Sequence, residues 1–206
     1  MNELFTFSLG VFMGFFAIMN PIANTPIFMA LTGDMDPLSK KRIARKSTIT
    51  AFIIVTAFVV LGKYIFDLFG ITIPAFKITG GILLFYVGFE MLMTQKSKIH
   101  SLGSKDPDEG IAISPLAIPI LAGPGTIVTA MEKVTNANYL HLGIVVCIFA
   151  LMIFLTYLAF SKSDIIVKKI GINMIKIIGK IMGLILAIMG TGMVIAGIKL
   201  AFSISE

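Results

Sequence analysis

Residues suited to binding a solute are concentrated at two points of an otherwise apolar chain. They are Asn20, Asn24 and Thr25 in one segment and Gly123, Gly125 and Thr126 in another. Neither segment holds the His, Asp or Cys partner that would activate a nucleophile or act as a general base. Amides, hydroxyls and glycine backbone can instead exchange hydrogen bonds with a small polar solute. We therefore expect a binding site and not an enzyme, with no metal ion and no cofactor.

Two prolines accompany each group and predict an interruption of the helix. The first segment is Pro21-Ile22-Ala23-Asn24-Thr25-Pro26, and the second is Pro119-Ile120-Leu121-Ala122-Gly123-Pro124. A proline inside a helix removes a backbone donor and clashes with the carbonyl four residues earlier. Glycines weaken the second segment further. We expect helix breaks or re-entrant tips at 20–26 and 119–126.

The composition places these segments in a membrane. Of the 206 residues, 57% are hydrophobic and only 14% are charged, whereas roughly a quarter are charged in soluble domains. No charged residue occurs from 4 to 33, from 110 to 131 or from 134 to 161. Uncharged apolar runs of about 18 residues or more are typical of transmembrane helices. The pattern predicts an all-α polytopic membrane protein, and it excludes a soluble enzyme, a nucleic-acid-binding domain and a disordered tail.

Six transmembrane helices are predicted, at 4–31, 43–66, 71–94, 112–132, 139–161 and 175–202. The first, third and fifth connections hold eleven Lys and Arg residues, against four on the opposite side. We expect the protein in the plasma (inner) membrane. Because cytoplasmic loops carry the excess of Lys and Arg, the first, third and fifth connections should face the cytoplasm. Both termini then lie outside. This placement also accounts for the net charge of +6 without a nucleic-acid partner.

The chain also contains an internal repeat. The motif Pro-Ile-x-x-x-Pro recurs at an offset of 98 residues, and the segment around Lys77 resembles the segment around Lys176 at an offset of 99. Each half holds three spans, an odd number, so the two copies must lie in opposite orientations in the membrane. We expect two inverted three-helix repeats at 1–95 and 112–206, joined by a cytoplasmic connector at 96–111, which is a plan of many secondary transporters.

The expected breaks have two interpretations. The half-helices that start there would point their N-terminal N–H groups toward each other near the midplane of the membrane, where they suit a carboxylate or another anion. Buried Asn20 and Asn24 amides also require partners, since an unpaired one costs about 1–3 kcal/mol. The alternative is that these side chains only cap helix ends and satisfy one another.

Four stretches resemble the MarC family of integral membrane proteins. They are NPIANTPIF at 20–28, TGGILLF at 79–85, PLAIP at 115–119 and AGPGTI at 122–127. The resemblance extends over essentially the whole chain. Some archaeal members, of the SnatA type, are proton-coupled transporters of the small neutral amino acids glycine and alanine. The resemblance therefore implies a symporter of a small zwitterion.

Alternatives of other classes remain open beside this transporter hypothesis. The same architecture could export a different small solute, which a large and mostly apolar cavity would favour. A non-transporting membrane protein would show no solute-dependent stabilisation and no flux. An intramembrane enzyme lacks a catalytic set.

Overall fold

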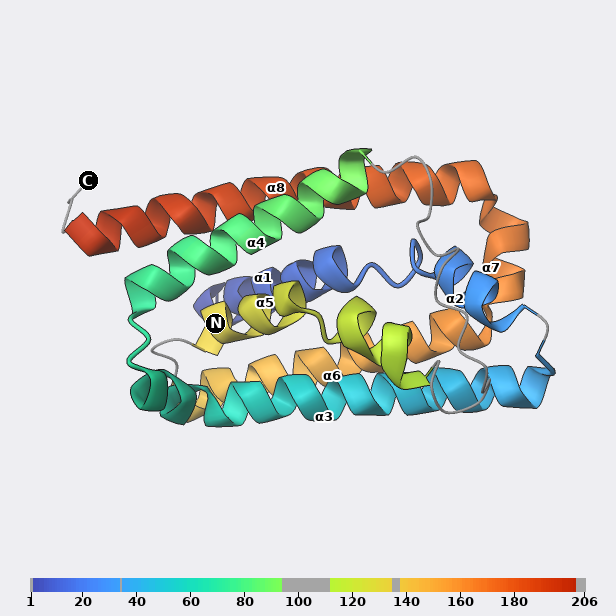
Figure 1. The fold of residues 1–206 in the computed structure, drawn as a ribbon, viewed down its shortest axis with the longest axis horizontal. Coiled ribbons are helices and arrows are strands. Elements are labelled where there is room, and N and C mark those ends of the chain that lie inside the picture. Colours follow the sequence, from blue (N-terminus) through green and yellow to red (C-terminus); the bar gives the residue numbers. More distant parts are fainter. Residues whose placement is uncertain (1, 34, 94–111, 135–137, 203–206) are drawn as a thin grey trace.

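A computed structural model of the protein describes residues 2–33, 35–93, 112–134 and 138–202 (Figure 1). Its elements are α1 (Asn2–Met19), α2 (Thr25–Thr32), α3 (Pro37–Phe69), α4 (Ile73–Met93), the π-helix η2 (Ala112–Leu121), α5 (Pro124–Val134), α6 (Tyr139–Ser161), α7 (Ser163–Ile170) and α8 (Ile172–Phe202). Every regular element in the described part is a helix, so the all-α prediction is confirmed there. The connector predicted at 96–111 lies outside the described residues.

Four of the described helices are long and apolar enough to cross a membrane. They comprise Pro37–Gly62 within α3, together with the whole of α4, α6 and α8. Their mean hydropathy runs from 1.5 to 2.7, and lengths of 21 to 31 residues cover a hydrocarbon core about 30 Å thick. These four helices agree with four of the six spans predicted from the sequence.

The other two predicted spans are each divided into two shorter helices. The segment predicted at 4–31 consists of α1 and α2, separated by residues 20–24, and the segment at 112–132 consists of η2 and α5, separated by residues 122–123. Pro124 accounts for the second division, because it supplies no backbone N–H and its ring clashes with the carbonyl four residues earlier, whereas Pro115 and Pro119 lie inside η2. The helix there has the wider π geometry, and the N–H of Ala122 donates to the carbonyl of Ala117 at 2.8 Å.

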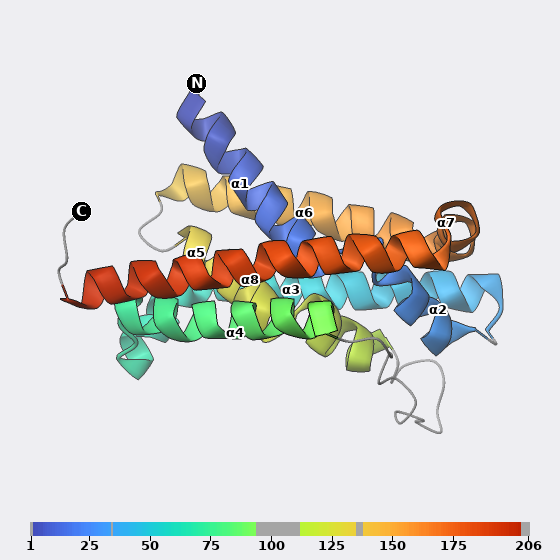
Figure 2. The same ribbon diagram turned by 90° about the horizontal axis from the view of Figure 1, so that it is seen from above.

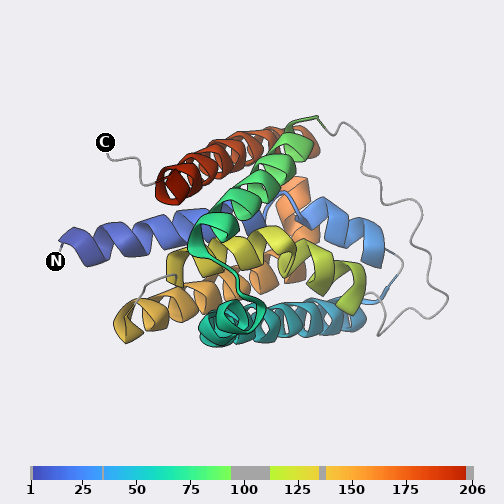
Figure 3. The same ribbon diagram turned by 60° about the vertical axis from the view of Figure 1, so that its left-hand side comes forward.

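The helices form three layers (Figures 1 and 3). α4 and α8 make one outer layer, α3 and α6 make the other, and the divided helices α1–α2 and η2–α5 lie between them. α1 packs on α6, α3 packs on η2, and α1 and α5 contact each other inside the bundle. The two divided segments therefore lie between the two pairs of long helices, with the first half of α1 projecting beyond them (Figure 2).

Glycines allow α4 and α8 to approach at backbone distance, and Figure 2 shows the two helices side by side. A Cβ atom on Gly88 would lie 2.5 Å from the carbonyl oxygen of Gly183, and one on Gly190 would lie 2.5 Å from the carbonyl oxygen of Gly81. Small residues serve this purpose in membrane helix pairs, where van der Waals contact replaces the hydrophobic effect. These glycines are thus required for the packing of α4 on α8.

Aromatic side chains fill the opposite side of the bundle. Phe15 of α1 lies against Phe149 of α6 with ring centroids 4.9 Å apart, and Phe28 of α2 stacks on Phe160 at 4.7 Å. All four rings are buried. Because both halves of the first divided segment contact α6 in this way, the position of the break between them is held by the core.

The connections fall at two opposite ends of the bundle. The α3–α4 connection, the last turn of α5 and the first turn of α6 lie at the end where α1 begins and α8 terminates, which we call the terminal end (Figure 1). The opposite end holds the start of α3 and the whole of α7, and we call it the basic end. Basic residues at this end include Lys40, Lys41, Arg42, Arg45, Lys46, Lys162, Lys168, Lys169 and Lys176.

Candidate functional site

Asn20 terminates α1 and turns the chain into the first break. Its backbone has a φ of +36°, a left-handed conformation that Asn tolerates better than most residues. The residue is only 2% exposed, and its Oδ1 accepts a hydrogen bond from the N–H of Ala23 at 3.3 Å. That bond sets the orientation of the amide. The Nδ2 of the same amide is buried and has no hydrogen-bond partner. The first break therefore contains an unsatisfied donor.

The side chain of Asn24 connects the start of α2 to the end of α1. Its Nδ2 donates to the carbonyl of Met19 at 2.7 Å, which satisfies a carbonyl at the end of α1. Thr25 is fully buried, and its hydroxyl donates to the carbonyl of Ile22 at 2.6 Å. Asn24 occupies the N-cap position of α2, yet its side chain makes no cap hydrogen bond. α2 thus starts without a side-chain cap, although the N–H of Thr25 donates to the carbonyl of Ile22 at 3.2 Å and Pro26 has no N–H.

Unlike α2, the long helices α3 and α6 start with a side-chain cap. At their starts, the Oδ1 of Asp36 accepts from the N–H groups of Leu38 and Ser39, and the Oδ1 of Asn138 accepts from the N–H of His141. Hydrogen bonds from the side chain and backbone of Ser39 hold the pKa of Asp36 below its usual value. Side-chain caps are thus present at the starts of these two long helices and absent at the start of α2, inside the bundle.

The second break is short and made of small residues. α5 begins directly at Pro124, a favoured first residue of a helix, and the residue before it, Gly123, has no side chain with which to cap. Gly125 and Thr126 follow and are buried. A Cβ atom on Gly125 would lie 2.8 Å from Cδ1 of Ile18, so the start of α5 packs closely on the last turn of α1.

The structure brings the two breaks into one neighbourhood but does not join their polar groups. Gly125 packs on Ile18, which is two residues before Asn20, and Ala23 of the first break faces Gly179 of α8. Among the described residues, no hydrogen bond links Asn20, Asn24 or Thr25 to Gly123 or Thr126. Of the remaining prolines, Pro21 lies in the break, Pro26 is in the first turn of α2, and Pro119 is inside η2.

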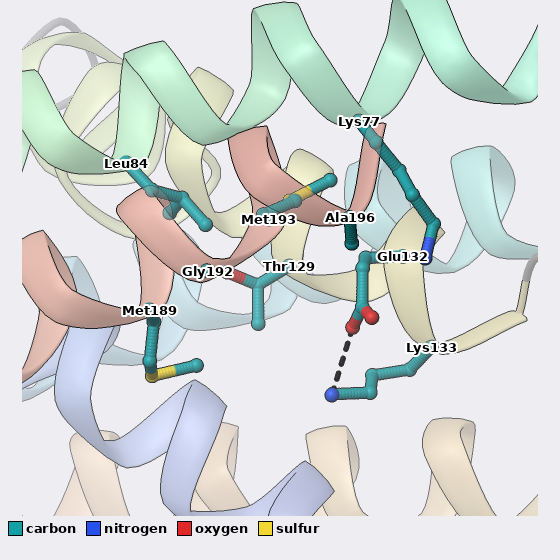
Figure 4. Close-up of a pocket in the computed structure, with 9 residues that line it drawn as sticks. All are labelled: Lys77, Leu84, Thr129, Glu132, Lys133, Met189, Gly192, Met193 and Ala196. Carbon is teal, nitrogen blue, oxygen red and sulfur yellow. Dashed lines mark ion pairs between the residues drawn. The ribbon is translucent and has the colours of Figure 1, made fainter. Parts of the chain in front are cut away.

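A cavity of about 210 Å³ lies between α4, α5 and α8 (Figure 4). Its lining residues Lys77, Lys133 and Ala196 place it closer to the terminal end than either break. Its polar and charged lining residues are Lys77, Thr129, Glu132 and Lys133, and the others are Leu84, Met189, Gly192, Met193 and Ala196. The hydroxyl of Thr129 is buried with no partner. Glu132 and Lys133 form an ion pair with an oxygen–nitrogen distance of 2.8 Å.

Leu84 separates this cavity from the second break. It lines the cavity, is 3% exposed, and its Cδ2 lies 3.6 Å from the position of a Cβ atom on Gly125. Thr126 lies one helical turn before Thr129, on the same side of α5. The cavity and the second break are thus neighbours along α5, with the side chain of Leu84 between them.

Thr129 and Glu132 were not singled out from the sequence, and Lys77 was named there only as part of the internal repeat. A usable signal was present, because Thr126, Thr129 and Lys133 are spaced as i, i+3 and i+7 on one face of a helix in a chain poor in polar residues. Within the described residues, no three His, Cys, Asp or Glu side chains gather closely enough to hold a metal ion.

Comparison with known proteins assigns the chain to a family. A profile of the MarC family integral membrane proteins matches residues 5–202. The chain belongs to the MarC family. The membrane protein YvbG of Bacillus subtilis is 40% identical over 207 residues, covering 98% of both chains, and the membrane protein PH0760 of Pyrococcus horikoshii is 40% identical over 197 residues, covering 94% of this chain and 95% of its own.

Other MarC-family relatives extend to a second archaeal genus. The membrane protein MJ1677 of Methanocaldococcus jannaschii is 35% identical over 195 residues, covering 91% of this chain and 94% of its own. No solved structure matches the chain. The family assignment and the four long apolar helices together establish an integral membrane protein.

Proposed function

We propose that this MarC-family protein is a secondary transporter of small neutral amino acids, of the glycine and alanine class, coupled to protons. One observation carries the proposal. The buried Nδ2 of Asn20 has no acceptor, next to a helix start that has no side-chain cap. Donors left unsatisfied inside a membrane protein cost about 1–3 kcal/mol each. A carboxylate that accepts from them during binding would remove that cost.

The proposed substrate matches the chemistry of the breaks. Its carboxylate accepts from Asn20 and from N–H groups in the first turns of the half-helices that have no backbone acceptor, which excludes Thr25 and the two prolines. The helix dipole favours negative charge there. Its ammonium group donates to backbone carbonyls and to the Oδ1 of Asn24. Backbone at Gly123 and Gly125 allows close approach, while Ile18 against Gly125 leaves little room for a large side chain.

The inverted repeat supplies the proposed mechanism of alternating access. The order of a divided helix followed by long helices occurs twice, as α1–α2, α3, α4 and as η2–α5, α6, α8. Corresponding elements run in opposite directions in Figure 1, and the contact of α1 with α6 has its counterpart in the contact of α3 with η2. Rocking one repeat against the other would expose the breaks to each side in turn.

The charge distribution supports an orientation in the plasma (inner) membrane. The basic residues at the starts of α3 and in α7 gather at one end of the bundle. By the positive-inside rule this end faces the cytoplasm. The terminal end, with the cavity nearer to it, then faces outward.

Export of a larger solute receives less support. The cavity of about 210 Å³ is lined by three charged side chains, whereas drug-sized ligands occupy mostly apolar pockets of roughly 300–1,000 Å³. A small solute fits this volume better.

Uptake of labelled glycine and alanine into proteoliposomes, with and without an inward proton gradient, tests the proposal. We expect saturable uptake that the gradient raises. Asn20→Ala should abolish most of it, whereas Asn173→Ala, at an exposed position of α8, should leave it unchanged. Absence of uptake by folded wild-type protein, or equal uptake by both variants, would overturn the proposal.

A further inference from the structure

The cavity between α4, α5 and α8 has a charged side and an apolar side. Figure 4 shows Lys77, Glu132 and Lys133 on one side, Leu84 and Met189 on the other, and Thr129 between them. Lys77 is nearer than Leu84 to the start of α4, which lies at the terminal end, and Glu132 and Lys133 are in the last turn of α5, which points to the same end. The charged side is therefore the outer part of the cavity.

The charges of this cavity do not balance. Glu132 is paired with Lys133 at 2.8 Å, which leaves Lys77 of α4 with no anionic partner among the residues that the structure describes. Lys77 is half-buried. An ammonium group that is partly removed from water and unpaired is stabilised by an anion that binds beside it.

Lys176, its counterpart in the sequence repeat, has different surroundings. Lys176 is exposed on α8 near the basic end and lines no cavity described here. An interfacial lysine of that kind extends its charge to water. The two lysines thus have the same place in the repeat but different environments, so repeat position alone does not explain the placement of Lys77 beside a cavity.

We infer that this cavity is a second binding site, separate from the helix breaks, for the carboxylate group of a small solute. The carboxylate pairs with Lys77, and the buried hydroxyl of Thr129 donates a hydrogen bond to it. Both groups lack a partner in the present structure, and both line the same cavity. A single small anion can satisfy the two of them.

The location relates this site to the proposed transport path, and that part of the inference rests on the proposed function. Leu84 closes the inner side of the cavity and contacts the start of α5. An amino acid held at Lys77 is therefore one side chain away from the second break. The cavity acts as an outer site that collects the substrate before Leu84 moves.

Gly192 provides an independent way to fill the cavity. It lines the cavity on α8, and a Cβ atom there would meet nothing within 4 Å. Gly143 of α6 has equally open surroundings but lies outside the cavity. Gly192→Leu should therefore obstruct the site without disturbing the helix packing, and Gly143→Leu is its matched control.

The test is a calorimetric titration of the purified full-length protein with acetate, with methylamine as the cationic comparison. We expect acetate to bind and methylamine not to bind. Lys77→Gln should weaken acetate binding at least about tenfold, which corresponds to about 1.4 kcal/mol, and Lys176→Gln should leave it unchanged. Gly192→Leu should weaken acetate binding, and Gly143→Leu should not.

The outcomes separate this inference from the proposed function. If wild-type protein does not bind acetate, or if Lys77→Gln and Gly192→Leu both bind it as the wild type does, the second site is wrong, whatever the uptake assay shows. If acetate binding depends on Lys77 but glycine and alanine are not taken up, the site stands and the proposed function fails. If both hold, Asn20→Ala should retain acetate binding while losing uptake.

Discussion

The side-chain amide of Asn24 reaches back across the first break and donates to the carbonyl of Met19 at 2.7 Å. The residue that could cap α2 thereby stabilises the end of α1. This side-chain bond acts beside the backbone bond from the N–H of Asn24 to the carbonyl of Asn20 at 3.1 Å, and α2 starts without a side-chain cap. The break is held in place by Asn24 while Asn20 keeps an unpaired donor.

Asn24→Ala should remove this bridge and leave the Met19 carbonyl unpaired. Because an unsatisfied buried acceptor costs about 1–3 kcal/mol, we expect the free energy of unfolding to fall by about that amount, measured by denaturation in mixed micelles. Uptake should fall as well, since the geometry of the break would relax. Membrane insertion should be retained.

Asn24→Asp is the sharper variant, because a carboxylate keeps the shape of the amide but cannot donate. It would place negative charge against the Met19 carbonyl and should destabilise at least as much as Asn24→Ala. Asn173→Ala on the exposed face of α8 is the control and should change neither quantity. If both Asn24 variants have the free energy of unfolding of the wild type, the hydrogen bond from Asn24 to Met19 does not stabilise the break.

Gly125→Ala should disturb the contact between the two divided segments. The added Cβ atom would lie 2.8 Å from Cδ1 of Ile18, and overpacking of this kind costs about 1–3 kcal/mol. Ile18→Val removes that Cδ1 atom, so the double variant should recover much of the lost stability. A double-mutant cycle measures the coupling directly, and additive effects of the two substitutions would contradict the contact.

The start of α3 should respond to pH through Asp36. Its pKa is lowered from 3.8 by hydrogen bonds from the side chain and backbone of Ser39. The charged carboxylate therefore stabilises the first turn at pH values above the ordinary pKa of Asp, and this contribution is lost as the pH falls through the lowered pKa. Hydrogen-exchange protection of the Leu38 and Ser39 amides, corrected for intrinsic rates, should decrease over that range. Asp36→Asn keeps a capping oxygen but does not titrate, so a decrease of the same size in that variant would exclude Asp36 as the cause.

The main helices and their interruptions could be predicted from the sequence, but the cavity could not. Proline and glycine restrict the backbone wherever they occur, so the helix ends near Asn20 and Pro124 could be placed from local chemistry alone. Whether Asn24 caps its own helix or bridges to Met19 depends on how near α1 ends, which is a tertiary distance. The cavity likewise depends on how α4, α5 and α8 pack, and the hydrophobic pattern did not distinguish Lys77 beside a cavity from Lys176 on the surface.

Leu84→Ala tests whether one side chain separates the cavity from the second break. Removing a buried leucine side chain costs about 2–5 kcal/mol, and here it would also connect the cavity to the backbone at Gly125. If the two repeats alternate, this opening should let glycine pass without full closure, so uptake should become less dependent on the proton gradient. Leu83→Ala, at a neighbouring exposed position of α4, is the matched control and should keep the gradient dependence. Gradient-dependent uptake that is equal in the wild type and Leu84→Ala would show that the substrate reaches the break by another route.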